Sequence, residues 1–206
     1  LWLKILGQKW DTIGFNPAAY RLKNCLIGIG MGMCSVLLII GAARMSKTIF
    51  LKTSIPLQET FFKCALYLAA AIIVAIFEEL FFRGMVLQTL LRDISPRKAL
   101  ILSSIFYSVI HFMKFTTEPF KVLARAFGLF LVGMILGKAF MKTRTLYLSI
   151  GMHAAWIFSI RSYKLFFDIR ETNLFLWGDN IFLGGIISWL FLLGTSIIIS
   201  NLPIKK

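Results

Sequence analysis

The stretch FEELFFRG, residues 77–84, sets three ionisable side chains in the middle of an otherwise apolar run. These are Glu78, Glu79 and Arg83. The run extends from about Phe61 to Leu91, longer than the roughly 20 residues that a helix needs to cross a bilayer. A charged group near the bilayer centre costs about 2.5–3.5 kcal/mol on insertion scales. Charge at this depth indicates a functional site, and we expect the long helix around it to tilt, project or kink.

The composition of the whole chain predicts an integral membrane protein. Of the 206 residues, 58% are hydrophobic and 16% are charged, whereas a soluble domain is about half apolar and a quarter charged. The net charge is +14, but the basic residues cluster between apolar runs, as Lys and Arg do at membrane boundaries. We therefore expect membrane lipids, and not nucleic acid, as the partners of this charge. Because the chain begins at Leu1, we also expect a trimmed sequence that lacks upstream helices.

Six apolar runs predict an all-α fold, a polytopic transmembrane helical bundle in one membrane domain over residues 1–206. Residues 1–20 form a predicted interfacial amphipathic segment. The six predicted spans are about Asn24–Ala43, Phe61–Leu91, Arg97–Phe115, Phe120–Met141, Leu146–Phe167 and Ile181–Ile199. Gly28 and Gly32 in the first span, and Gly133 and Gly137 in the fourth, have the small-xxx-small spacing that permits close helix packing.

The two histidines of the chain, His111 and His153, both lie in predicted spans. At 1.5 Å per residue, Glu78 and His111 lie roughly 20 and 22 Å from one membrane face, and His153 lies roughly 12 Å from it. The three side chains can therefore converge near the middle of the membrane. A lone intramembrane histidine is commonly a hydrogen-bonded packing residue, but two together with intramembrane carboxylates favour a shared site.

The two neighbouring carboxylates are expected to differ in role. Glu79 and Arg83 are spaced i,i+4 with the acid first, which favours an intrahelical ion pair. Glu78 points about 100° away around the helix and has no partner on its own helix. Desolvation disfavours its charged form, which suits a general acid or base. The structural alternative is a Glu that stays protonated.

These residues resemble the motifs of the CPBP family, the CAAX proteases and bacteriocin-processing enzymes, also called ABI or type II CAAX prenyl endopeptidase-like proteins. FEELFFRG is similar to the motif EExxxR, and Tyr107 to His111 is similar to FxxxH, with Tyr in the aromatic place. The third motif is a His followed four residues later by Asn. His153 matches it, but Ile157 stands where Asn is expected. The resemblance covers about residues 61–199.

The resemblance implies an intramembrane endopeptidase that cleaves a membrane-associated or lipidated peptide substrate. Glu78, His111 and His153 would be the catalytic set, in which Glu78 and His111 activate a water and His153 stabilises the oxyanion. It also implies a multi-pass protein of a bacterial cytoplasmic membrane. No cofactor is firmly predicted, although two His and one Glu form an acceptable zinc set and the resemblance leaves a divalent metal open.

The remaining motif positions would organise the site: Glu79, Arg83, Tyr107 and Ile157. Ile157 removes one oxyanion donor, a loss that typically costs about 10²–10³ in rate. Asn180, Ser103, Ser104 or a backbone N–H could replace it.

Two other classes of function compete with a peptidase. One is a catalytically weak or inactive membrane scaffold or regulator that binds peptides or a membrane-protein partner, which Ile157 favours. The other is a proton-coupled transporter, because Glu and His chains also form proton relays. Against transport, the sequence has no inverted repeat and no paired broken helices.

Overall fold

The structure is a computed structural model that describes residues 14–15, 21–111, 119–170, 173, 175–178 and 180–203. Its elements, in chain order, are α2 (Arg21–Met45), β1 (Ile49–Leu51), α3 (Leu57–Glu79), the π-helix η2 (Leu80–Leu87), α4 (Gln88–Asp93), α5 (Pro96–His111), α6 (Pro119–Thr143), α7 (Tyr147–Phe166), β2 (Phe167–Ile169) and α8 (Ile186–Asn201). Each of the six predicted spans contains a helix, which confirms the helical bundle. The sixth helix begins at Ile186, later than predicted, because residues 181–185 form turns. The predicted amphipathic segment, residues 1–20, lies outside the described residues except for 14–15.

Three helices of the described chain are long and apolar enough to cross a membrane by length and composition. They are α2, the continuous helix Leu57–Asp93 that contains α3, η2 and α4, and Phe120–Thr143 of α6. Their outer faces carry large exposed apolar side chains, such as Leu37 at 60% and Ile73 at 56% exposure. Such faces suit lipid, because hydrocarbon chains are as apolar as the side chains that meet them.

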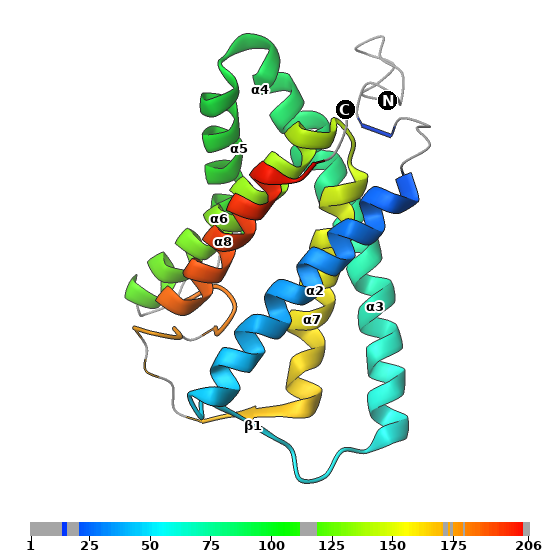
Figure 1. The fold of residues 1–206 in the computed structure, drawn as a ribbon, viewed down its shortest axis with the longest axis vertical. Coiled ribbons are helices and arrows are strands. Elements are labelled where there is room, and N and C mark those ends of the chain that lie inside the picture. Colours follow the sequence, from blue (N-terminus) through cyan, green and yellow to red (C-terminus); the bar gives the residue numbers. More distant parts are fainter. Residues whose placement is uncertain are drawn as a thin grey trace.

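The long second helix changes its helical form directly after the paired carboxylates. Glu79 is the last residue of α3, and Leu80–Leu87 is a π-helix before α4 resumes the α form. Figure 1 shows α3 on the right of the bundle and α4 at its top, where it leads into α5. A π-helical stretch alters which residues share a face, and such stretches occur often at functional sites. The sequence predicted that this long helix tilts, projects or kinks. In the structure, the helix contains a local π-helix at Leu80–Leu87.

The central helix is α7, which packs against α2 on one side and α3 on the other (Figure 1). Its contact with α2 depends on glycine. A Cβ added at Gly28 would lie 2.2 Å from the carbonyl oxygen of Leu148, and one at Gly32 would lie 2.8 Å from the Cβ of Ala155. The small-xxx-small spacing in this helix therefore serves close packing, as predicted.

The second glycine pair, on α6, has the same function against α5. A Cβ added at Gly133 would lie 3.0 Å from the Cα of Ser104, and one at Gly137 would lie 2.4 Å from Cδ1 of Leu100. α6 also contacts the π-helix η2.

One element was not predicted from the sequence. The strands β1 and β2 pair antiparallel, with Ile49 opposite Ile169 and Leu51 opposite Phe167. The ribbon joins the chain after α2 to the end of α7 at one end of the bundle (Figure 1). Strands of three residues carry too little periodicity to be recognised, and this pair forms only because α2 and α7 already lie side by side.

Candidate active site

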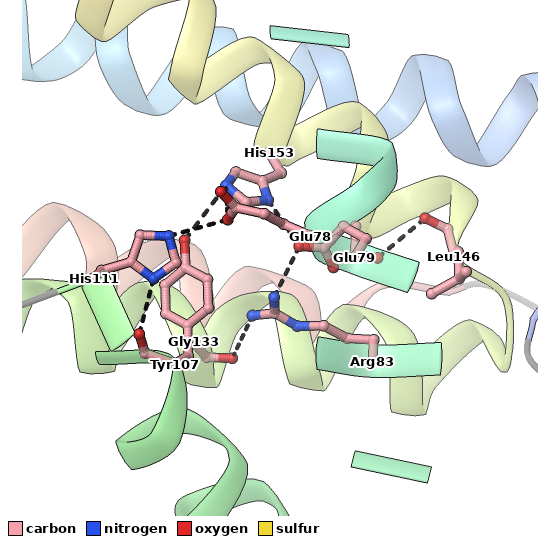
Figure 2. Close-up of polar contacts among 9 residues, drawn as sticks. Glu78, Glu79, Arg83, Tyr107, His111, Gly133, Leu146 and His153 are labelled. Carbon is pink, nitrogen blue, oxygen red and sulfur yellow. Dashed lines mark hydrogen bonds and ion pairs between the residues drawn. The ribbon is translucent and has the colours of Figure 1, made fainter. Parts of the chain in front are cut away.

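The structure brings Glu78, His111 and His153 together from three helices (Figure 2). Glu78 lies in the last turn of α3, His111 is the last residue of α5, and His153 lies within α7. The Nε2 atom of His111 is 3.1 Å from Oε2 of Glu78, and Nε2 of His153 is 3.7 Å from the same oxygen. The convergence predicted from helix depth is therefore present.

These side chains line a cavity of about 270 Å³ within the bundle. Its polar lining residues are Ser35, Glu78, Tyr107, His111, His153, Trp156 and Arg161, and the rest of its wall is mainly apolar, including Ile157. The side chains of Glu78 and His111 are 25% and 26% exposed, whereas that of His153 is only 5% exposed. Glu78 and His111 thus face the space that a substrate and a water would occupy.

The second carboxylate, Glu79, is buried and has two partners. Its Oε1 atom accepts a hydrogen bond of 2.8 Å from Nη1 of Arg83 and another of 2.8 Å from Nδ1 of His153. Arg83 also donates through Nη2 to the carbonyl oxygen of Gly133 at 3.2 Å. The predicted Glu79–Arg83 ion pair is present and almost fully buried, with side-chain exposures of 0% and 1%.

The partners of the ring nitrogens determine where the protons lie. A carboxylate and a carbonyl oxygen only accept, so Nδ1 of His153 donates to Glu79 and Nδ1 of His111 donates to the carbonyl oxygen of Tyr107 at 2.8 Å. In a neutral ring the other nitrogen, Nε2, is then an acceptor. The contact between Nε2 of His111 and the Glu78 carboxyl therefore requires one proton held between them.

Several residues of the site were not predicted from the sequence. Trp156 donates through Nε1 to the hydroxyl of Ser35 at 2.8 Å, which joins α7 to α2 at the cavity wall. The backbone carbonyl of Gly133 is the acceptor for Arg83. A carbonyl acceptor has no residue signature, and the proximity of Ser35 depends on the packing of α2. Trp156 could have been found, because it lies three residues after His153 on the same helix face.

The side chains considered as replacements for the missing Asn do not line the cavity. The hydroxyl of Ser104 donates to the carbonyl oxygen of Leu100, and Oδ1 of Asn180 accepts from the backbone N–H of Phe182. Ser103 is buried elsewhere in the packing of α5. These three side chains therefore do not replace the missing Asn, because they face other helices or the turn before α8.

The same residues are the nitrogen and oxygen donors that a divalent metal would need. Among the described residues, no group of three or more His, Cys, Asp and Glu side chains is arranged to hold a metal ion. The carboxylate and imidazole groups of the site instead contact one another directly.

Comparison with known proteins gives a family match over the central part of the chain. Residues 60–159 match the family model of type II CAAX prenyl endopeptidase Rce1-like proteins. No curated protein and no solved structure gave a significant match. The matched range contains the paired carboxylates and both histidines, together with most of α3 and α7 and all of the helices between them. The match over residues 60–159 supports the resemblance of this chain to the CAAX proteases, whose Rce1-like members are helical membrane proteins.

Proposed function

We propose that this protein is an intramembrane endopeptidase in which Glu78 and His111 activate a water for attack on a peptide bond. The single observation that carries this proposal is the 3.1 Å contact between Oε2 of Glu78 and Nε2 of His111, at the wall of a cavity within the bundle. The substrate would be a membrane-associated or lipidated peptide. The proposed setting is a bacterial cytoplasmic membrane, crossed several times by the helical bundle.

The proton shared by Glu78 and His111 gives the pair its chemistry. The water oxygen attacks the carbonyl carbon while a proton of the water passes to the pair, which then holds two protons. When the C–N bond breaks, one of these protons passes to the leaving nitrogen, so the pair returns to its starting state. A group that takes and returns a proton in this way contributes about 10²–10⁴ to the rate.

Glu79 and Arg83 would support the reaction without touching the substrate. Both are buried, and Glu79 holds Nδ1 of His153 while Arg83 supplies the compensating charge. This arrangement fixes the ring of His153 at the cavity, 3.7 Å from Oε2 of Glu78. Preorganised geometry of this kind avoids reorganisation at the moment of reaction.

A membrane scaffold that binds peptides without cleaving them is the alternative. It is favoured by Ile157, an apolar side chain on the cavity wall where the family motif leads us to expect Asn. A scaffold would use the cavity and the surrounding helices but would not depend on the charge of Glu78.

The test compares wild type with Glu78→Gln, which keeps the shape of the side chain and removes its acid–base function. Both proteins are purified in detergent and incubated with a peptide library, and products are identified by mass spectrometry. We expect cleavage by wild type, none by Glu78→Gln, and equal or greater membrane abundance of the variant. Glu59→Gln, which changes an exposed carboxylate at the start of the same helix, is the matched control and should cleave normally.

Undiminished activity of Glu78→Gln at normal abundance would end the peptidase proposal. A cellular phenotype that survives Glu78→Gln, together with no cleavage by wild type, would support the scaffold.

A further inference from the structure

The cavity offers few free hydrogen-bond donors to a substrate. Trp156 donates through Nε1 to the hydroxyl of Ser35 at 2.8 Å, and this hydroxyl donates to the carbonyl oxygen of Gly32 at 2.8 Å. His111 uses its Nδ1 for the carbonyl oxygen of Tyr107. Each of these donors already makes a short hydrogen bond within the protein, so none of them is free to bind a substrate.

Two further side chains of the cavity contain nitrogen, His153 and Arg161. Neither places an N–H donor beside Glu78 when the His153 ring is neutral. His153 gives its Nδ1 proton to Glu79, so its Nε2 atom accepts in the neutral ring. Arg161 lies eight residues further along α7, which at 1.5 Å per residue is about 12 Å from His153. His153 can therefore donate to an oxyanion only when its ring carries a second proton. A peptide attacked beside Glu78 still lacks a second donor, because Ile157 supplies none.

The hydroxyl of Tyr107 is placed to be that donor. The ring is only 3% exposed and packs edge-on against Phe82, with centroids 4.8 Å apart, while Cζ of Arg83 lies 4.9 Å from the ring centre. Its oxygen contacts Nε2 of His153 at 3.4 Å, which is long for a hydroxyl donor, whose bonds are about 2.7–2.8 Å. A closely packed ring thus holds a weakly used O–H at the cavity wall. Figure 2 shows Tyr107 between His111 and Arg83.

We propose that the Tyr107 hydroxyl donates a hydrogen bond to the oxyanion and replaces the donor that is missing at Ile157. This inference rests on the peptidase function proposed above. The motifs that the sequence resembles have Phe at position 107 and Asn at position 157, whereas this chain has Tyr and Ile. The chain therefore gains one donor on α5 and loses one on α7, and both positions line the same cavity.

The hydroxyl serves the first step of the reaction. The water oxygen forms a bond to the carbonyl carbon, the π electrons of C=O move to the oxygen, and the water proton passes to the Glu78–His111 pair. The Tyr107 O–H turns from Nε2 of His153 to this oxyanion and keeps its proton. The C=O bond then reforms, the C–N electron pair leaves with the nitrogen, and the nitrogen takes a proton from the pair.

The experiment measures peptide cleavage by wild type, Tyr107→Phe, Ile157→Asn and the double variant, all purified in detergent. Tyr107→Phe keeps the ring and removes one oxygen, so we expect kcat to fall by about 100-fold with little change in KM. Ile157→Asn in the Tyr107→Phe background should restore much of this loss, because it returns a donor to the same cavity. The matched control is Tyr163→Phe, which removes the hydroxyl of a second buried tyrosine, on α7, and should leave kcat unchanged.

A catalysis-independent measurement uses the cleaved peptide with a phosphinate in place of its scissile amide. This analogue carries the tetrahedral oxyanion, so it should bind wild type about 100-fold more tightly than Tyr107→Phe. Binding of the ordinary peptide to a Glu78→Gln background should be the same with Tyr or Phe at 107.

The outcomes separate this inference from the function on which it rests. Wild-type rates in Tyr107→Phe, or equal binding of the phosphinate to both proteins, would overturn the role of Tyr107 and leave the peptidase standing. If Ile157→Asn fails to rescue Tyr107→Phe, Tyr107 acts only by positioning His153, and the inference also fails. No cleavage of any peptide by wild type would overturn both.

Discussion

Nδ1 of His153 lies 2.8 Å from Oε1 of Glu79, the same oxygen that accepts the hydrogen bond from Arg83. Glu79 thus connects the buried charge of its own helix to an imidazole on α7. From the i,i+4 spacing alone, Glu79 appeared only as the partner of Arg83. The contact with His153 makes the Glu79–Arg83 ion pair part of the site, because the Glu79 carboxylate fixes the proton of the imidazole on Nδ1.

Removing Arg83 should destabilise the fold as well as the site. Arg83→Ala leaves the buried Glu79 carboxylate without its cation, and breaking a buried pair in this way costs about 3–5 kcal/mol. We expect a large loss of membrane abundance and a lower melting temperature in detergent. Arg92→Ala, at an exposed arginine of the same continuous helix, should change neither. Normal folding of Arg83→Ala with loss of cleavage alone would contradict the structural role.

Neutralising both members of the pair should separate folding from activity. A buried ion pair can often be replaced by hydrophobic residues of similar volume without loss of stability, so Glu79→Leu with Arg83→Met should regain abundance that each single change loses. Cleavage should stay low in the double variant, because His153 no longer has an anionic acceptor for Nδ1. Abundance and cleavage are measured in parallel on the same preparations. Recovery of both would mean that the orientation of His153 does not depend on the charge of Glu79.

The contact between α2 and α7 should depend on Gly28 and not on glycine in general. A Cβ at Gly28 would lie 2.2 Å from the carbonyl oxygen of Leu148, so Gly28→Ala must push the helices apart. The same change at Gly30, on the same helix, meets nothing within 4 Å and gains up to about 1 kcal/mol of helix propensity. We expect a lower melting temperature for Gly28→Ala and an unchanged or higher one for Gly30→Ala. Equal behaviour would show that α2 does not pack closely on α7.

Loss of the Ser35 hydroxyl should lower the stability of the fold. Ser35→Ala leaves the indole N–H of the buried Trp156 without its acceptor, and an unsatisfied buried donor costs about 1–3 kcal/mol. Thermal unfolding in detergent should register this loss. Restoring an acceptor of similar size with Ser35→Thr should recover most of the stability. A melting temperature unaffected by Ser35→Ala would mean that Trp156 finds another partner.

The sequence by itself determined the features that depend on the local geometry of one helix. Six apolar runs predicted the six helices, because each backbone satisfies its own hydrogen bonds in lipid, and three helices of the described chain are long and apolar enough to cross a bilayer. The i,i+4 spacing set the Glu79–Arg83 pair, and the constant rise per residue set the depths of Glu78, His111 and His153. Small residues four apart marked the close faces of α2 and α6.

Only the tertiary structure decided which groups meet across helices. The partner of Glu79 on α7, the Gly133 carbonyl that receives Arg83, and the Tyr107 hydroxyl at the cavity wall all come from segments far apart in the chain. The π-helix after Glu79 and the β1–β2 ribbon were also decided only by the tertiary structure. The physical reason is that a helical pattern fixes direction and depth along one axis, whereas rotation and contact between helices follow from packing the whole bundle.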